Sequence, residues 1–384
     1  MAHKRIQISN ATIEDLGSEG KSITRYENKV IFTAFAAPGD VVDLEIYRSK
    51  KGYAEAKITA IHTYSDERAT PHCIHFGTCG GCKLQHIKYE RQLHYKQKQV
   101  VDALIRIGKL DIPTIEPILG SALQIGYRNK LDFSVSNKRW FTETEIGTSE
   151  SLEPNGIGFH IPGRFDKVLD IDQCHHQMEP SNAIRLGIKK FLLDNNLSFF
   201  DLWKQTGFLR GVTLRNTQKG VFMLIIQFGE ENQEWIDKTC TYLTTTFPEI
   251  ETLYYVVNTK KNDSIYDLDL IQHSGKGYLE EEMEGLTFRI SPKSFYQTNP
   301  SQAYELYKLT RSFAKLTGTQ TVYDLYTGTG TIANFIAKQA GKVVGIESVP
   351  MAIEDAKLNS SINNICPPGS GASSFTGTVI RLVG

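Results

Sequence analysis

The sequence of 384 residues lacks the features that mark several classes of protein. No apolar run reaches the ~18 residues of a membrane span, and the start, MAHKRIQISN, has no apolar stretch of signal-peptide length. The 31 glycines follow no repeat period, which excludes a collagen-like protein. The formal net charge is zero, so total charge does not identify a partner. We therefore expect a cytoplasmic protein without a membrane segment.

The neutral total hides a local excess of positive charge. Residues 63–140 carry 12 basic and 7 acidic side chains, a net charge of +5. Such a region is typical of a surface that binds a nucleic-acid backbone, although solvated surface lysines would give the same count. A hydrophobic fraction of 40% is enough to build cores, and at roughly 100–200 residues per domain the length predicts two or three domains.

The pattern of strands and helices predicts a multidomain β and α/β protein. Residues 1–62 hold short β-rich runs between Gly and Pro, typical of a small barrel of the OB type. Residues 63–290 read as a mixed α+β domain, with a helix over 86–110. Residues 291–365 start with an amphipathic helix over 301–316, with Ser301 as its N-cap, and continue as a β-α-β-α run. That run is the opening of a Rossmann-like, doubly wound sheet.

Four of the six cysteines form a pattern typical of a metal site. Cys73, Cys79 and Cys82 fall within ten residues as C-x5-C-G-G-C, and Cys174 lies 92 positions later. In a cytoplasmic protein a close cysteine cluster favours a metal over disulfides. Four thiolates suit tetrahedral zinc or a [4Fe-4S] cluster. Three ligands together with one remote ligand favour iron–sulfur, with zinc and buried cysteines without metal as the alternatives.

A glycine-rich turn connects the first strand of the Rossmann-like run to its helix. The stretch Asp324 to Thr331 contains Gly328 and Gly330, and Glu347 ends the next strand. Glycines allow close approach of a cofactor, and a carboxylate at the second strand end can accept both ribose hydroxyls of an adenosine. The pattern Gly328-x-Gly330-x-x-Ala333 also fits a loose dinucleotide fingerprint, which would make the protein an NAD-linked oxidoreductase. Asp324 and the lack of a third glycine favour S-adenosylmethionine, which has no pyrophosphate.

Together these features resemble the S-adenosylmethionine-dependent RNA uracil-5-methyltransferases, most closely the iron–sulfur type that acts on 23S ribosomal RNA. The barrel is similar to a TRAM domain, and the cysteine pattern with Cys174 is similar to the family's [4Fe-4S] ligands. Tyr127-Arg128-Asn129-Lys130 and Phe295-Tyr296-Gln297-Thr298-Asn299 are similar to the family's YRNK and F-x-Q-x-N motifs. The resemblance covers about residues 1–365.

The resemblance implies a set of site residues and partners. Gln297, Tyr326 and Glu347 stand at positions similar to the family's cofactor contacts, and Gly328 and Gly330 form the turn beneath the cofactor. Thr331 stands where some relatives have Asn. The implied partner is ribosomal RNA with an exposed uridine, and no protein partner is indicated. In the implied reaction a cysteine thiolate adds to uracil C6 so that C5 can accept the methyl group, and a base then removes the C5 proton.

The family's catalytic motifs are not found in this sequence. It contains neither D-P-P-R nor S-C-N-P, and no acidic residue follows Asp355. The only cysteine after Cys240 is Cys366, in a different context, so no catalytic residue is assigned. Residues 366–384 read as an aberrant tail, and the methyltransferase domain is expected to be truncated. The alternative to a methyltransferase is therefore a catalytically inactive, RNA-binding iron–sulfur protein.

Overall fold

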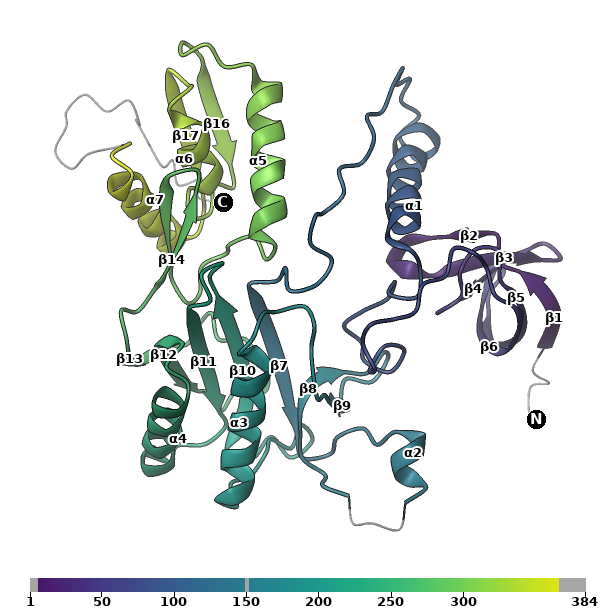
Figure 1. Ribbon diagram of the computed structural model, residues 1–384, viewed down its shortest axis with the longest axis horizontal. Helices are drawn as coiled ribbons and strands as arrows, with labels where there is room; N and C mark the ends of the chain where they lie inside the picture. Colours follow the sequence, from purple (N-terminus) through teal and green to yellow (C-terminus); the bar gives the residue numbers. More distant parts are fainter. Residues whose placement is uncertain (1–5, 149–151, 366–384) are drawn as a thin grey trace. The chain divides into compact units, whose positions relative to one another are not determined.

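The computed structural model describes residues 6–148 and 152–365, which fall into two compact units (Figure 1). The first unit comprises Met1–Ser121 with His160–Gly163, and the second comprises Ala122–Phe159 with Arg164–Gly384. Within the described ranges, no helix is both long and apolar enough to cross a membrane. The predicted tail, 366–384, lies outside the described residues.

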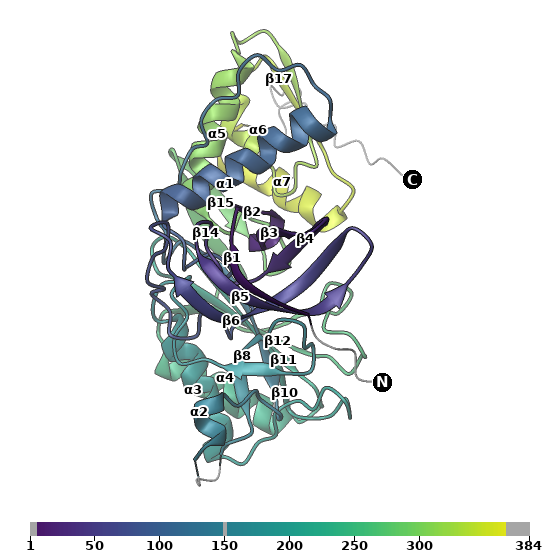
Figure 2. The same cartoon turned by 90° about the vertical axis from the view of Figure 1, so that its right-hand side faces the viewer.

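The first unit begins with the predicted barrel. Its strands are β1 (Ile6–Thr12), β2 (Asp15–Leu16), β3 (Ser22–Tyr26), β4 (Lys29–Thr33), β5 (Val41–Ser49) and β6 (Tyr53–Thr63), with a short 3-10 turn at Ser18–Gly20. They form one sheet in the order β1-β5-β6-β4-β3-β2, whose long strands curl strongly in Figure 2. Strand β1 pairs with β5 at one edge of the sheet, and β2 pairs with β3 at the other. Since β2 follows β1 directly in the chain, residues 6–16 connect the two edges. Alternate residues such as Val42, Leu44 and Ala54 fill the core.

An irregular segment carrying three of the cysteines follows the barrel and leads into α1 (Tyr89–Asp102). The predicted helix over 86–110 is shorter, because after Asp102 the chain continues as a π-turn at Ala103–Ile107. Asp40, in the turn before β5, joins the barrel to this segment. Its fully buried carboxylate accepts hydrogen bonds from the backbone of Ala37 (2.6 Å) and Ser65 (2.9 Å) and from the Arg68 guanidinium (2.7 Å).

The charge state of Asp40 follows from these donors. Burial alone would raise the pKa of the carboxyl, but the Arg68 guanidinium and the backbone N–H groups outweigh it and lower the pKa below the usual value. The stabilisation is therefore fully present above the unfolded-state pKa near 3.8 and is lost as the pH falls through the lower folded-state pKa.

We expect Asp40→Asn to lower the free energy of unfolding of the first unit by about 3 kcal/mol at pH 7, because it leaves the Arg68 charge without its counter-ion. Urea denaturation at pH 7 and at pH 3 measures the loss, which shrinks at the lower pH. Asp43→Asn is the control, since Asp43 on β5 accepts the Asn10 N–H (2.8 Å) and pairs with His62, and both contacts lie at the surface. Equal losses in the two variants would contradict the assignment.

The central part of the second unit is a seven-stranded mixed sheet in the order β13-β12-β11-β10-β7-β8-β9. The strands are β7 (Lys130–Ser136), β8 (Gly156–His160), β9 (Val168–Asp170), β10 (Leu209–Asn216), β11 (Phe222–Phe228), β12 (Ile250–Val257) and β13 (Ile271–Ser274). The short helix α2 (Glu143–Ile146) lies in the loop after β7. Helices α3 (Ser181–Asp194) and α4 (Gln233–Thr246) pack together, with Phe191 stacked on Tyr242 at 4.6 Å between ring centroids.

The C-terminal part contains a hairpin and the predicted parallel strand pair. The hairpin is β14 (Leu279–Met283) with β15 (Leu286–Ile290), and it precedes α5 (Pro300–Ala314). Two parallel strands then alternate with two helices: β16 (Thr321–Leu325), α6 (Thr331–Ala337), β17 (Lys342–Ile346) and α7 (Pro350–Ile362). A common core joins these elements; its members include Phe288, Tyr296, Tyr307, Phe335 and Val343. The predicted Rossmann-like opening is therefore present.

The N-cap of α5 differs from the prediction by two residues. Ser301 is not the N-cap; the side chain of Asn299 accepts the Gln302 N–H at 3.0 Å, and Pro300 occupies the first helical turn. Asn is as good a cap as Ser, and proline at the first position lacks only an N–H that the helix cannot use. The predicted cap at Ser301 was therefore wrong.

Candidate functional site

The glycine-rich turn lies where the two parallel strands end. Leu325 pairs with Ile346, so the residues that follow them, Tyr326 and Glu347, lie at the same edge of the sheet. The turn between β16 and α6 needs positive backbone φ at Gly328 (57°) and Gly330 (75°). A Cβ on Gly328 would meet no atom within 4 Å, so the space above this residue is open.

Tyr326 adopts the same unusual backbone region without being a glycine. Its φ is 62°, and its side chain is 89% exposed. A bulky residue in the left-handed region costs free energy, which the surrounding turn has to offset. The result is an aromatic ring presented to solvent at the same edge of the strand pair as Glu347.

Two carboxylates, those of Asp324 and Glu347, accept hydrogen bonds from the turn. Asp324 accepts hydrogen bonds from the hydroxyl of Thr327 (2.7 Å) and from the N–H of Ala333 in α6 (3.0 Å), and burial raises its pKa. Glu347 accepts the N–H of Gly328 (3.0 Å) on one oxygen and those of Ser348 and Val349 on the other. Burial raises the pKa of Glu347, but these backbone donors outweigh it and the pKa is lowered, so Glu347 is ionised at neutral pH.

Thr331, the last predicted contact in the turn, faces inward. Its hydroxyl lies 3.0 Å from that of Thr329, and both side chains are buried. The structure therefore places Tyr326, Gly328 and Glu347 at the open side of the turn, whereas Gly330 packs against Asn334 and Ala356 and Thr331 is buried.

The loop that carries Gln297 is held by residues of the central sheet. The side chain of Asn129 donates to the backbone oxygen of Gln297 at 3.0 Å, and its N–H donates to that of Thr298 at 2.9 Å. The two stretches singled out in the sequence, 127–130 and 295–299, are thus in direct contact. Gln297 itself is half-buried.

Arg215 fixes the start of the same loop. Its guanidinium is almost fully buried and donates to the backbone oxygens of Ser291 (3.3 Å) and Ser294 (2.9 Å). No carboxylate shares these bonds, and burial lowers the pKa of the guanidinium to about 10. Arg215 could not be recognised from the sequence, because within the strand pattern of 212–215 it looks like an ordinary outward-facing residue.

A polar stripe made of Asp355 and Asn359 on α7 and of Asn363 at its C-cap lies against β15 and the loop after it. Asn363 pairs with the N–H and the oxygen of Thr287, both at 2.8 Å, and Asn359 pairs in the same way with Arg289. Asp355 accepts from the hydroxyls of Ser291 (2.8 Å) and Ser294.

The stripe fits because two spacings match. Four residues of helix advance ~6 Å and two residues of strand ~6.7 Å, so every fourth helical residue meets every second residue of the chain beside it. Asn359 also donates to the oxygen of Thr329 at 3.1 Å, which connects the stripe to the glycine-rich turn.

The predicted metal ligands are divided between the two units. Cys73, Cys79 and Cys82 lie in the first unit and Cys174 in the second. Cys174 is fixed locally, since its N–H donates to the Asn182 side chain (2.8 Å), which donates back to its oxygen (3.1 Å). Among the residues that the structure describes, no group of three or more His, Cys, Asp or Glu side chains is placed to hold a metal ion. The four-cysteine site remains a prediction.

Comparison with known proteins identifies the family. The TRAM domain family matches residues 4–59, the barrel. A protein of Bacteroides thetaiotaomicron named an uncharacterized RNA methyltransferase is 50% identical over 354 residues, which cover 91% of this chain and 78% of that protein. This chain belongs to the RNA methyltransferases. A Porphyromonas gingivalis protein of the same name is 47% identical over 359 residues, covering 92% of the RNA methyltransferase described here and 77% of its relative.

A solved structure shares both the fold and part of the sequence. The Pyrococcus abyssi tRNA (uracil-54, C5)-methyltransferase in complex with S-adenosyl-L-homocysteine matches with a TM-score of 0.70 and 26% identity. The match covers 100% of this RNA methyltransferase and 81% of the archaeal chain. The predicted resemblance to S-adenosylmethionine-dependent RNA uracil-5-methyltransferases is therefore confirmed, whereas the iron–sulfur, 23S type stays a prediction.

We expect Asn359→Ala to lower the free energy of unfolding by about 2 kcal/mol, because it leaves buried backbone groups of Arg289 and Thr329 without partners. Asn363→Ala is the matched control on the same stripe, since it contacts β15 but not the turn. Amide hydrogen exchange distinguishes the two: exchange across 327–333 rises in the Asn359 variant only. Equal exchange of the turn in both variants would disprove the link from the stripe to the turn.

Proposed function

We propose that this RNA methyltransferase transfers a methyl group from S-adenosylmethionine to C5 of a uridine in 23S ribosomal RNA. The observation that carries the proposal is the edge of the parallel strand pair, where an ionised carboxylate, an exposed aromatic ring and an open glycine turn adjoin. The family and the match to a uracil-C5 methyltransferase bound to S-adenosyl-L-homocysteine support the same cofactor. When bound, S-adenosylmethionine supplies an electrophilic methyl group.

Glu347 is suited to bind one ribose hydroxyl. An ionised carboxylate has about four acceptor sites, two on each oxygen. One oxygen of Glu347 is taken by the N–H groups of Ser348 and Val349, with the Ser348 hydroxyl at 3.5 Å, and the Gly328 N–H takes one site of the other. The remaining site is on the oxygen that faces Gly328. A carboxylate at this strand end can in general accept both ribose hydroxyls, but in the present arrangement Glu347 has room for one.

The remaining proposed contacts follow from position. Tyr326 is exposed beside Glu347, and Gly328 leaves space above the turn, so an adenosine would lie along this edge. Gln297 is proposed as a contact because Asn129 and Arg215 fix its loop against the central sheet.

The turn disfavours the alternative of an NAD-linked oxidoreductase. Binding of a pyrophosphate at the start of a helix uses unpaired backbone N–H groups and the positive end of the helix. Here the N–H of Ala333 in α6 already donates to Asp324, and that carboxylate would repel a phosphate. S-adenosylmethionine carries no phosphate, so the same arrangement does not disfavour it.

The nucleophile of the proposed reaction is not assigned. Cys240, the last cysteine among the described residues, is fully buried in α4, and burial raises its pKa to about 12, so it is a neutral thiol at physiological pH. Cys366 lies outside the described residues. This observation favours a second candidate function, an RNA-binding protein that holds the cofactor without transferring the methyl group.

Methyl transfer from labelled S-adenosylmethionine tests the proposal. The expected result is labelling of unmodified 23S ribosomal RNA and not of unmodified tRNA. Labelling of tRNA alone would contradict the proposed substrate and show that the substrate is tRNA. RNA binding without labelling would favour the second candidate.

Calorimetry with S-adenosyl-L-homocysteine tests the cofactor edge separately from turnover. Glu347→Ala is expected to weaken binding at least tenfold, because the ribose loses a charge-assisted hydrogen bond of about 1.5–3 kcal/mol. Glu354→Ala, an exposed acid on α7 paired with Lys357, should bind as the wild type does. Binding unaffected by the Glu347 change would contradict the cofactor assignment.

For the cysteines we propose a [4Fe-4S] cluster held by Cys73, Cys79, Cys82 and Cys174, with zinc as the alternative. Support comes from the spacing and from the loop itself: the N–H of Gly81 donates to the Cys79 sulfur, and a Cβ on Gly80 would lie 2.4 Å from the backbone oxygen of His160. The residues as placed do not form a metal group, so no step of the reaction is derived through a cluster.

Anaerobically purified protein is expected to be brown and to contain iron, since a cluster absorbs visible light. Cys174→Ser should lose most of the iron and the colour, whereas Cys240→Ser, which changes a buried cysteine outside the set, should keep both. A colourless protein with stoichiometric zinc would show that the site binds zinc and not a cluster. A protein that contains neither metal would disprove the site.

A further inference from the structure

Three loops of the second unit meet at the end of the central sheet opposite to the Gln297 loop. They comprise residues 137–142, 164–168 and 200–205. Backbone hydrogen bonds join the first loop to the other two: the N–H of Asn137 donates to Phe200 (3.1 Å), and that of Trp140 donates to Val168 (2.8 Å). The methyltransferase site described above uses none of these residues.

The loops present two large aromatic rings to solvent side by side. Phe165 is 69% exposed and Trp203 65% exposed, and their ring centroids lie 5.6 Å apart. A single exposed hydrophobic residue is ordinary on a protein surface, but an adjoining pair of exposed rings leaves apolar area that a ligand can cover.

Trp203 is held in place from beneath by Asp201. The buried carboxylate of Asp201 accepts the N–H groups of Trp203 (2.9 Å) and Lys204 (3.1 Å), and also the ammonium of Lys138 (2.9 Å). The Trp203 loop is therefore already ordered, which reduces the entropy that a ligand would lose in ordering it.

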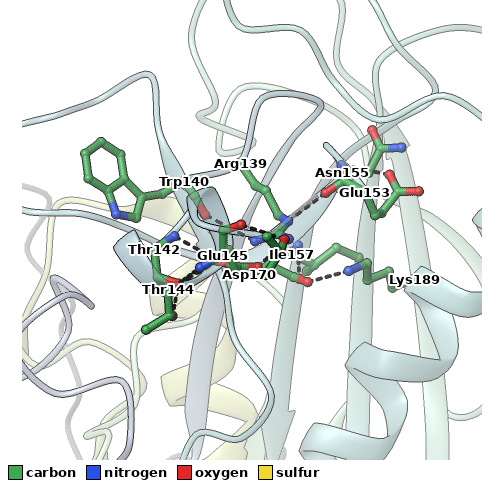
Figure 3. Close-up of polar contacts among 11 residues, drawn as sticks. Arg139, Trp140, Thr142, Thr144, Glu145, Glu153, Asn155, Ile157, Asp170 and Lys189 are labelled. Carbon is green, nitrogen blue, oxygen red and sulfur yellow. Dashed lines mark hydrogen bonds and ion pairs between the residues drawn. The ribbon is translucent and has the colours of Figure 1, made fainter. Parts of the chain in front are cut away.

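The first loop is ordered by a separate set of contacts. Figure 3 shows the Arg139 guanidinium between the Glu145 carboxylate (2.6 Å) and the backbone oxygen of Glu153 (2.7 Å). Thr142 and Glu145 add a capping box at the start of α2.

The charge around the rings is positive. Lys138 pairs with Asp201, Arg139 with Glu145 and Arg164 with Asp166, so the positive excess on the three loops comes from Lys167 and Lys204. Aromatic rings surrounded by cations are suited to bind an unpaired nucleotide, with the base on the ring and the phosphate near the ammonium groups. A protein partner of ordinary affinity would require a larger continuous apolar patch.

We propose that Phe165 and Trp203 form a stacking platform for an unpaired base of the RNA substrate, away from the uridine that is methylated. This inference rests on the proposed function. Strand β7 separates the two places: Asn129 contacts the Gln297 loop, and Asn137 lies on the platform side eight residues later, about 26 Å along an extended strand. The platform receives a nucleotide in the flanking part of the RNA.

Filter binding tests the platform with a 23S ribosomal RNA transcript and with a fully paired RNA duplex of equal length. Trp203→Ala and Phe165→Ala should each raise the dissociation constant for the transcript about tenfold and leave that for the duplex unchanged. The dependence of binding on salt should keep its slope, because no charge is removed. Lys204→Ala should instead reduce the slope by about one.

Two further variants separate stacking from a loss of folding. Trp203→Phe keeps a ring and should bind within about threefold of the wild type. Phe313→Ala is the matched control, because Phe313 on α5 is 74% exposed but has no place on the platform; it should bind as the wild type does. With Trp140 and Trp235 replaced by Phe, the fluorescence of Trp203 should be quenched by the transcript and not by the duplex.

The outcomes distinguish the two proposals. If the wild type binds the transcript and both alanine variants bind it equally well, the platform is disproved while the proposed function stands. If the wild type binds neither the transcript nor tRNA, the proposed function fails and the platform fails with it. An equal loss for transcript and duplex would also overturn the platform, because stacking requires an unpaired base.

Discussion

Backbone groups buried away from water need hydrogen-bond partners, and in the C-terminal part of this protein one helix supplies many of them. The stripe of Asp355, Asn359 and Asn363 provides partners for β15, for the loop that leads to Gln297, and for the glycine-rich turn. These segments are far apart in the chain, and two of them have no regular structure of their own. Their mutual arrangement depends on α7, although α7 contributes none of the proposed cofactor contacts.

Sequence reasoning succeeded where local pattern decides structure. The β-α-β-α run over 321–359 was predicted because apolar periodicity, glycines and strand-forming residues all point to the same elements. Gly328 and Glu347 were candidates from the motif within that run and Tyr326 from the family resemblance; the structure places them at one edge of the strand pair, and their contact with a cofactor stays a proposal. The barrel was predictable for a similar reason: short alternating strands between turn residues have few other stable arrangements.

The polar partners were not predictable in this way. Asn359 and Asn363 on a helix look like residues that face solvent, and only the β15 backbone beside them gives them a buried role. Arg215 is a charge inside a strand, and nothing local indicates that it reaches backbone oxygens some 76 residues away. Hydrogen bonds of this kind depend on distant segments meeting, and a single sequence carries no direct signal for such meetings. The remote Cys174 poses the same difficulty, because its proposed partners belong to another unit.

If RNA binds at both proposed places, the length of strand β7 limits which RNA molecules can bind. Asn129 and Asn137 bound β7, and each is fixed by backbone hydrogen bonds, one to the Gln297 loop and the other to the Trp203 loop. A strand in the middle of a sheet neither stretches nor bends appreciably. An RNA that occupies both places therefore has to present its target uridine and a second unpaired base at a set separation. β7 would fix this separation. An RNA with the right local sequence but a different spacing between its two exposed bases could then not occupy both places at once.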